Sequence, residues 1–185
     1  MRIKLFYFFL FFNISISTQA SIKNEIINNF KKIENISFNF KQTIDEKTEI
    51  GNCIIQYPKK IYCEYDNFKK KIIVSNGRSL AIKNRATNQY FRYPLDKTPL
   101  NILLNKNYLI KEMEKLEGKL VNGKYFQFLL DNSENQINIF FDKNSYELIG
   151  WQTEDIYQNL VITFIYNIEK NKKIKQKYFL LPDIN

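Results

Sequence analysis

The sequence predicts a mainly β domain in which about eleven consecutive antiparallel strands form one sheet that curls around its apolar face. The composition favours strands, with 16 Phe and 12 Tyr against only 5 Gly and 4 Pro. Short stretches of alternating apolar and polar residues follow one another without linkers, and turn residues separate them. A closed barrel or a two-sheet sandwich would satisfy the same alternation, so the sequence leaves these architectures open.

Residues 1–20 are predicted to be a cleaved export signal, and residues 21–185 a single mature domain. Arg2 and Lys4 supply the positive start, and the apolar run over residues 5–12 is too short to span a bilayer as a stop-transfer helix. Small residues ending at Ala20 predict cleavage before Ser21, and no Cys follows that site. We therefore expect a soluble, exported protein that is not itself a lipoprotein.

The mature chain is predicted to begin with an amphipathic helix over residues 21–33, where Ile22, Ile26, Phe30 and Ile33 recur at helical spacing. Residues 36–44 then alternate strictly and predict the first strand. Its apolar face contains Phe38 and Phe40.

A hairpin of two strands, residues 51–57 and 60–66, is predicted around a turn at Pro58. Cys53 and Cys63 lie on the same face of this hairpin, about symmetrically around the turn. Facing positions on antiparallel strands can come within disulfide distance, and export would permit oxidation. The alternative is two small apolar core residues.

Further strands are predicted over residues 71–75, 78–83 and 89–93. Asn76-Gly77 is typical of a two-residue type I′ turn, which would place Ile73 opposite Leu80. After these strands, Thr98 is expected to cap a short apolar helix over residues 99–105, with Pro99 at its first position. Residues 108–115 could continue as helix or be irregular.

The rest of the chain is predicted to return to strands, over residues 116–121, 124–131, 136–142, 146–153, 158–169 and 175–181. Asn122-Gly123 predicts one of the intervening hairpins. In the longest strand, Leu160, Ile162 and Phe164 share one face, and Val161, Thr163 and Ile165 share the other. We assign the face with Ile162 and Phe164 to the interior.

Charge and residue types favour binding over catalysis. The formal charge is +9, and removing Arg2 and Lys4 leaves 26 basic against 19 acidic residues, or +7. The lysines are spread along the sequence without a concentrated basic helix or loop, so we predict a solvated surface and no nucleic-acid site. The chain has no His, which removes every His-based catalytic or metal site. We expect no catalytic residues, no metal and no cofactor.

The order of these landmarks resembles the LolA family, the periplasmic carriers of outer-membrane lipoproteins in Gram-negative bacteria. The matching features include an N-terminal amphipathic helix, Phe40-Lys41-Gln42, a Gly51-led strand ending at Pro58, Thr98-Pro99-Leu100 and a final Pro182. The resemblance covers residues 21–182. It implies an incomplete, half-open antiparallel β-barrel with a short helical lid over an apolar cavity that holds acyl chains.

The resemblance also implies partners and a mechanism. A monomeric carrier of this family would take triacylated lipoproteins from an inner-membrane lipoprotein-releasing ABC transporter and pass them to an outer-membrane lipoprotein receptor where one is present. The family usually has an Arg before the Pro that ends the second strand, and this Arg hydrogen-bonds to the lid. Tyr57 occupies that position here, and its hydroxyl is the candidate lid latch.

The predicted cavity is lined by apolar and aromatic side chains from both parts of the sheet and from the lid: Phe38, Phe40, Ile55, Tyr57, Ile61, Cys63, Tyr65, Leu100, Leu103, Leu104, Ile139, Phe141, Ile162 and Phe164. Spacing alone would fit an ordinary filled core equally well, and the resemblance favours a cavity. The sequence leaves two other functions open, a sensor or regulatory module on the same fold and a periplasmic hydrolase. The absence of His argues against the hydrolase.

Overall fold

The computed structural model describes residues 18–67, 70–131, 136–155 and 158–183. The predicted signal therefore lies almost entirely outside the described residues. Helix α1 (Thr18–Lys31) includes the predicted cleavage position before Ser21 in its first turn. None of the described residues forms a helix that is both long and apolar enough to cross a membrane.

Eleven strands form one antiparallel sheet in the order β6-β5-β4-β3-β2-β1-β11-β10-β9-β8-β7. The strands are β1 (Asn35–Ile44), β2 (Lys47–Gln56), β3 (Lys60–Tyr65), β4 (Lys71–Asn76), β5 (Ser79–Asn84), β6 (Tyr90–Pro94), β7 (Lys119–Val121), β8 (Tyr125–Asp131), β9 (Gln136–Asp142), β10 (Leu148–Glu154) and β11 (Leu160–Lys170). All neighbours except β1 and β11 are consecutive in the chain, so the sheet consists of two meanders joined at its centre.

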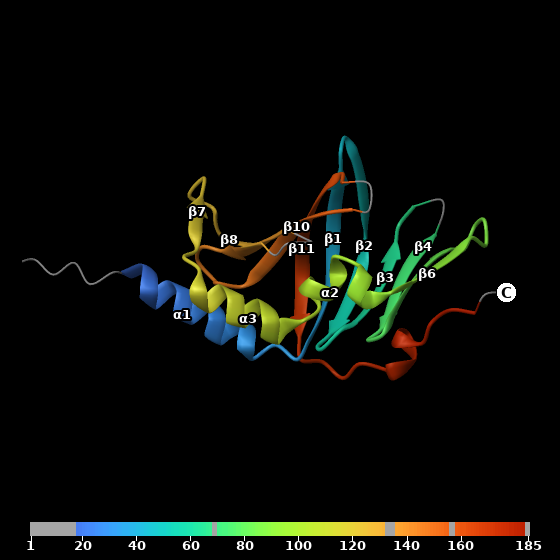
Figure 1. Ribbon diagram of the computed structural model, residues 1–185, viewed down its shortest axis with the longest axis horizontal. Coiled ribbons are helices and arrows are strands. Elements are labelled where there is room, and N and C mark those ends of the chain that lie inside the picture. Colours follow the sequence, from blue (N-terminus) through green and yellow to red (C-terminus); the bar gives the residue numbers. More distant parts are fainter. Residues whose placement is uncertain (1–17, 68–69, 132–135, 156–157, 184–185) are drawn as a thin grey trace, which may run out of the picture.

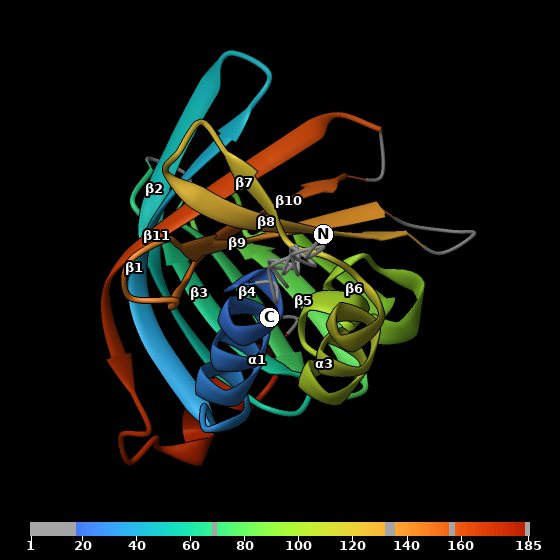
Figure 2. The ribbon, with the colours of Figure 1, turned by 90° about the vertical axis from the view of Figure 1, so that its left-hand side faces the viewer.

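The sheet curves strongly and stays open (Figures 1 and 2). Its edges, β6 and β7, are not paired with each other, which confirms the half-open architecture over a closed barrel or a sandwich. Helices α1 and α3 lie on the hollow side of the sheet in Figure 2. We call the side facing these helices the inner face and the opposite side the outer face.

The segment between the two meanders is helical. It contains η1 (Leu95–Lys97), α2 (Leu100–Leu103) and α3 (Lys106–Lys115), so residues 108–115 are helical. The predicted cap by Thr98 is wrong, because its hydroxyl donates 2.8 Å to the Leu95 carbonyl and Pro99 is the N-cap of α2. Asn105 caps α3, and its side chain accepts from the Tyr108 N–H. We call α2 together with Leu104 the lid.

The predicted last strand, residues 175–181, is wrong. Residues 172–183, which we call the strap, run outside the sheet and contain the 3-10 helix η2 (Gln176–Phe179). This helix packs on β3 and β4, and Phe179 is buried. Alternating apolar residues indicated a strand here, but β3 and β4 already have strand partners on both edges. The strap instead covers their outer face.

The two Asn-Gly turns differ. At Asn122-Gly123 both residues have positive φ, 50° and 64°, and the predicted hairpin is confirmed. At Asn76-Gly77 the predicted register is wrong, because Ser75 and not Ile73 pairs with Leu80. The turn residues are Gly77 and Arg78, and the Asn76 side chain accepts from the N–H groups of Arg78 and Ser79, 3.0 Å each.

A β-bulge in β11 determines which of its side chains face inward. The pairing of β1 with β11 shifts by one residue between Ser37 and Asn39, and Asn167 has a φ of 52°. The extra residue lets both Ile165 and Ile168 pack against the core, although they are three positions apart. This irregularity explains why a simple alternation misassigns the strand.

Candidate functional site

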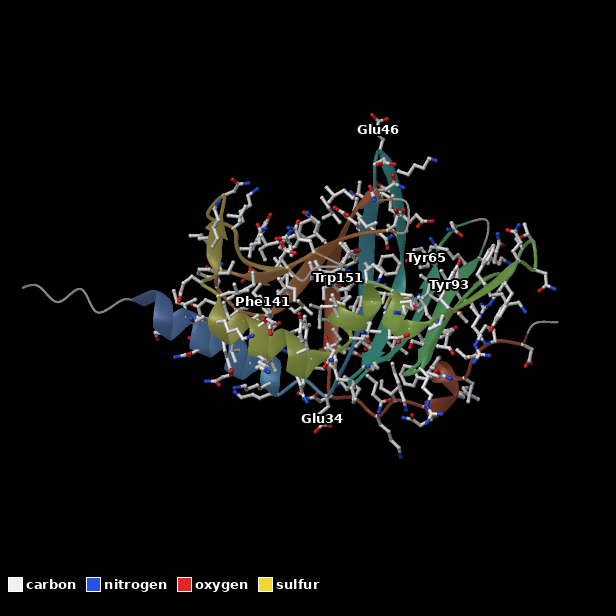
Figure 3. All side chains as sticks on the ribbon, in the orientation of Figure 1. Glu34, Glu46, Tyr65, Tyr93, Phe141 and Trp151 are labelled. Atoms are coloured by element: carbon white, nitrogen blue, oxygen red, sulfur yellow. A yellow bond between two sulfur atoms is a disulfide. The ribbon has the colours of Figure 1, made fainter. Side chains whose placement is uncertain are left out.

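The inner face of the sheet and the helices on it enclose one continuous apolar cluster. Twelve of the fourteen residues predicted to line a cavity belong to it or pack against it. They are Phe38, Phe40, Ile55, Tyr57, Ile61, Cys63, Tyr65, Leu100, Leu103, Leu104, Ile139 and Phe141. In Figure 3, the labelled Phe141, Trp151 and Tyr65 mark the length of this face. The structure thus brings together residues from both meanders and from the lid.

The assignment of Ile162 and Phe164 to the inner face is wrong. Phe164 is 41% exposed, whereas Val161, Thr163 and Ile165 are buried. Phe164 stacks on Phe140, with ring centroids 5.8 Å apart, and its ring lies beside Gly150 on the outer face. A Cβ on Gly150 would come within 2.3 Å of the Thr163 carbonyl oxygen and 3.3 Å of this ring, so the glycine allows β10 and β11 to approach closely here.

The helices supply inner-face residues that the predicted cavity omitted. Helix α1 buries Ile26, Ile27 and Phe30, and α3 buries Leu109, Ile110 and Met113. The Phe30 ring meets Phe141 edge-on at 5.8 Å and Tyr57 at 6.0 Å. The helical spacing of the α1 side chains was visible in the sequence, but spacing cannot show which strands they cover.

Helices α1 and α3 are joined to each other by charges at their surface. Lys23 pairs with Glu117 at 2.8 Å, and Lys31 pairs with Glu114 at 3.0 Å. Both glutamates are largely exposed, so these pairs add little to stability. They connect α1 with α3 and with the residue two positions after it.

A disulfide joins Cys53 to Cys63 across β2 and β3. The two residues are directly opposite each other in the register, with Cα atoms 4.1 Å apart, and both are buried on the inner face. Cys53 is also paired with Phe38 of β1. The bridge therefore fixes the part of the inner face on which Phe38 and Ile55 lie.

The lid meets the sheet at the turn between β2 and β3. The Lys59 N–H donates 2.9 Å to the Leu104 carbonyl, and the Tyr57 N–H donates 2.9 Å to the Glu34 carbonyl after α1. The Tyr57-Pro58 peptide bond at this turn is cis. We call this meeting point of Glu34, Tyr57, Lys59, Leu104 and Lys106 the lid corner.

The predicted latch through the Tyr57 hydroxyl is not formed. This hydroxyl is buried and has no hydrogen-bond partner among the described residues, and burial raises its pKa above the ordinary value of 10.0. Tyr65 differs, since its hydroxyl donates 3.0 Å to Gln42 Oε1, although burial raises its pKa as well. Backbone atoms, not the Tyr57 side chain, connect the β2–β3 turn to the lid.

Lys106 is a contact that sequence reasoning missed. Its Nζ donates to two carbonyls at the end of α1, those of Lys31 at 2.9 Å and Ile33 at 2.5 Å. A cation at a helix C-terminus is favourable, because the last carbonyls are otherwise without partners. Burial lowers the Lys106 pKa, and the nearby Glu34 carboxylate opposes this shift. Lys106 thus fastens the start of α3 to the end of α1.

The lid corner also has a surface pocket of about 330 Å³. It is lined by polar and apolar residues of three segments, the residues after α1, the β2–β3 turn and the start of α3: Glu34, Asn35, Gln56, Tyr57, Pro58, Asn105, Lys106 and Asn107. The pocket lies at the junction of three segments, whereas the apolar cluster lies behind it. Separation of these segments would open the cluster to solvent here.

The family model for the outer membrane lipoprotein carrier protein LolA matches residues 31–181. No curated protein matches the chain. Among solved structures, an uncharacterized conserved protein from Thermus thermophilus is 7% identical with a TM-score of 0.52, over 88% of this chain and 94% of that chain. This likeness shows a shared fold.

Two further structures are similar at lower TM-scores. A putative outer membrane lipoprotein-sorting protein domain from Vibrio parahaemolyticus is 10% identical, with a TM-score of 0.47 over 86% of this chain and 94% of that chain. The MucA/MucB complex of Pseudomonas aeruginosa contains a chain that is 8% identical, with a TM-score of 0.48 over 90% of this chain and 62% of that chain.

Proposed function

Because the chain belongs to the family of the outer membrane lipoprotein carrier protein LolA, we propose that it is a periplasmic carrier that holds the acyl chains of lipoproteins beneath its helices. It takes triacylated lipoproteins from an inner-membrane lipoprotein-releasing ABC transporter. It delivers them to the outer membrane, through a receptor lipoprotein where one is present. The carrier acts as a monomer, performs no chemistry and uses no cofactor.

The observation that carries this proposal is the continuous apolar cluster beneath a cover of separate helices. Transfer of an acyl chain from water gains about 0.8 kcal/mol for each buried CH₂, so a dozen methylenes gain on the order of 10 kcal/mol. An apolar face that runs from Tyr65 to Phe141 can supply this gain without any polar recognition. Affinity then depends on the acyl chains and not on the protein part of the cargo.

Loading requires the cover to move. Phe30 of α1 and Met113 of α3 are fully buried in the hollow of the sheet, and they occupy the space that acyl chains would take. The hydrogen bonds from Lys59 and Lys106 fasten the lid and α3 at one corner. A hydrogen bond of this kind contributes about 1 kcal/mol, so the acyl-chain gain exceeds the cost of releasing the corner.

The first test is native mass spectrometry of the exported protein with a triacylated lipopeptide and with the same peptide lacking acyl chains. We expect a one-to-one complex with the acylated form alone. A complex with both peptides would contradict acyl recognition and favour a regulatory protein-binding module. No complex with either peptide would mean that the apolar cluster is a packed core only.

The second test locates the acyl chains. Trp151 is the only Trp, and it is buried on the inner face with its ring edge-on to Phe38 at 6.0 Å. A lipopeptide with brominated acyl chains should quench Trp151 fluorescence, since bromine quenches at contact distance. In the matched control Trp151→Phe/Phe164→Trp, the reporter lies on the outer face and should not be quenched. Equal quenching of both proteins would contradict binding beneath the helices.

A further inference from the structure

The fold gathers lysines that are far apart in the sequence at one end of the molecule. The strap carries four of them, and the others are the residue after α1, the last residue of the β2–β3 turn and the first residue of β3. We call this set the basic end: Lys32, Lys59, Lys60, Lys172, Lys173, Lys175 and Lys177. Figure 1 shows the strap running along the same end of the molecule as the turn after α1.

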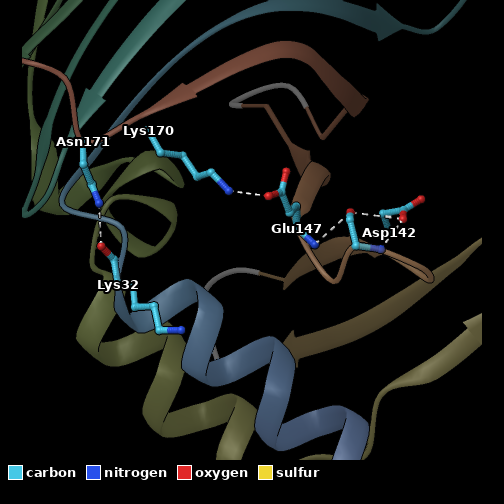
Figure 4. Close-up of polar contacts among 6 residues, drawn as sticks. Lys32, Asp142, Glu147, Lys170 and Asn171 are labelled. Atoms are coloured by element: carbon cyan, nitrogen blue, oxygen red, sulfur yellow. Dashed lines mark hydrogen bonds and ion pairs between the residues drawn. The ribbon is translucent and has the colours of Figure 1, made fainter.

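Hydrogen bonds hold these segments side by side. The Asn171 side chain donates 2.9 Å to the Lys32 carbonyl (Figure 4) and accepts from the Glu34 N–H at 2.8 Å. The Lys172 N–H donates 3.1 Å to the Asn35 side chain. On the other side, Lys60 Nζ donates 3.0 Å to Gln176 of the strap. The segments that carry the lysines are therefore held next to one another.

The charge of this surface is not neutralised locally. None of the seven lysines forms an ion pair with any carboxylate in the described part of the chain. Asp183 lies within the strap, and Glu34 and Glu169 are the acidic residues next to these segments in the sequence, so seven lysines stand against three carboxylates. All four strap lysines are exposed. The basic end thus has a clear positive surplus that extends into solvent.

The strap adds an apolar side chain to these cations. Leu180 is 70% exposed, the largest value among the exposed large apolar residues of the described chain, and it follows Lys177 by three positions. The buried Phe179 and the contact of Tyr178 with Tyr62, 5.1 Å between ring centroids, fix the strap on the sheet. A lysine cluster beside an exposed Leu is the pattern that binds the headgroup region of an anionic bilayer.

We propose that the basic end docks the protein on anionic phospholipid headgroups, with the strap against the membrane surface. The inference rests on the proposed carrier function, because the lid corner lies at this same end. Docking places the lid corner next to the bilayer. In the proposed carrier function, the helices separate from the sheet at this corner. Acyl chains then pass between membrane and protein over a short distance instead of crossing open water.

A lipid surface fits this end better than an acidic protein. Lysine ammonium groups on flexible stems act as point charges, which suit headgroups that rearrange in a fluid plane. Recognition of fixed carboxylates usually relies on the rigid, bidentate guanidinium, whereas the basic end consists of lysines, with a single Arg, Arg78, in the neighbouring turn between β4 and β5. The exposed Leu180 has no role against a purely acidic, polar partner.

The test is cosedimentation of the exported protein with vesicles of phosphatidylcholine alone and of equal parts phosphatidylcholine and phosphatidylglycerol. We expect binding to the anionic vesicles only, and weaker binding as salt rises. Replacing the four strap lysines should weaken partitioning at least about tenfold. The variant is Lys172→Gln/Lys173→Gln/Lys175→Gln/Lys177→Gln.

The matched control loses the same net charge from exposed lysines elsewhere: Lys111→Gln/Lys119→Gln/Lys124→Gln/Lys143→Gln. It should bind anionic vesicles within about twofold of the unmodified protein. If both variants bound anionic vesicles equally weakly, net charge alone would explain the binding, and the proposal would be overturned. Tighter binding to polyglutamate than to anionic vesicles would overturn it in favour of an acidic protein partner.

A failure of the docking proposal can be distinguished from a failure of the carrier proposal. Circular dichroism should show that both variants are folded, and quenching of Trp151 by the brominated lipopeptide is measured without vesicles. The strap variant should keep normal quenching and lose vesicle binding. Normal quenching of the unmodified protein without any vesicle binding would overturn the docking proposal and leave the carrier proposal intact.

Discussion

The inner and outer faces of the same curved sheet carry similar apolar side chains but are covered in different ways. On the inner face, three helices enclose one cluster that reaches from Tyr65 to Phe141. On the outer face, the strap covers Ile72, Val74 and Ala81, while the aromatic group around Phe164 stays partly exposed. The helical cover spans a large surface and is fastened at a corner, whereas the strap is a short segment held by the buried Phe179 ring and a few hydrogen bonds.

In the proposed carrier function, acyl chains bind on the inner face, whereas the strap stabilises the fold on the outer face. The strap covers a small apolar patch of the outer face with Phe179. Two hydrogen bonds hold it there, one from Lys60 to Gln176 and one from Gln176 to Gln56. The helices and lid rest on a far larger apolar area, with backbone and Lys106 hydrogen bonds concentrated at the lid corner. In the proposed carrier function, the helices and the lid lift together while the sheet keeps its shape.

The largest expected effect comes from removing an inner-face ring. Phe141 is fully buried and meets Phe30 and Phe128 edge-on, both at 5.8 Å, so Phe141→Ala should lower the free energy of unfolding by about 3–5 kcal/mol. The matched outer-face variant Phe164→Ala should cost only about 1 kcal/mol. Urea denaturation measures both. Equal losses would mean that the two faces are packed alike.

Loss of the disulfide should have the next largest effect. The bridge closes a loop of ten residues, and such a loop predicts a stabilisation of about 3 kcal/mol. A reductant should therefore lower the urea midpoint of the unmodified protein. The Cys53→Ala/Cys63→Ala variant should show a low midpoint that the reductant does not change. Alkylation without prior reduction should leave the mass of the native protein unchanged, and two added labels would contradict the bridge.

Removal of the strap's anchor should cost less, because the strap can detach while the sheet remains folded. For Phe179→Ala we expect about 2 kcal/mol at most in global stability. Hydrogen exchange should rise in the strap and on the outer face of β4, where Ile72 and Val74 lose their cover. Faster exchange throughout the inner face instead would show that the strap is part of the main core.

The smallest expected change in stability comes from removing the Tyr57 hydroxyl at the lid corner. The buried Tyr57 hydroxyl has no described partner, so Tyr57→Phe should be neutral or stabilise by about 1 kcal/mol at pH 7. Tyr65→Phe is the matched variant and should destabilise, because its hydroxyl bond to Gln42 is lost. A destabilised Tyr57→Phe protein would indicate a hydrogen bond at this hydroxyl.

The same variant has an expected pH dependence. The Tyr57 pKa is raised in the folded protein above 10.0, so the unfolded chain loses its proton first. The folded protein therefore loses stability as pH rises above about 10, and below that pH the contribution is constant. Tyr57→Phe should show a shallower loss of stability in this alkaline range. An unchanged slope would mean that this hydroxyl ionises freely in the folded state.

The sequence was sufficient for most strands because each has a regular period of two. The alternation of Phe38 and Phe40 in β1, and of Ile61, Cys63 and Tyr65 in β3, identified the inner face of the first meander. Prediction failed in β11, where the bulge at Asn167 breaks the period and Phe164 packs beside a glycine on a neighbouring strand. The position of the bulge and the packing of Phe164 can be known only from the pairing of β11 with β1 and β10.

For the candidate site, the sequence by itself determined which side chains are apolar and, in most strands, which of them share a face, and its order of landmarks indicated a curved β-sheet of the LolA family. The tertiary structure decided what lies together. In the folded protein, Lys106 contacts the end of α1, and the Lys59 backbone N–H, not the Tyr57 hydroxyl, bonds to the lid. The strap, with its lysines, lies beside the segments that carry Lys32 and Lys60. The physical reason is that periodicity fixes the face on which a side chain lies within its own element, whereas its partners depend on pairing and packing between elements distant in the chain.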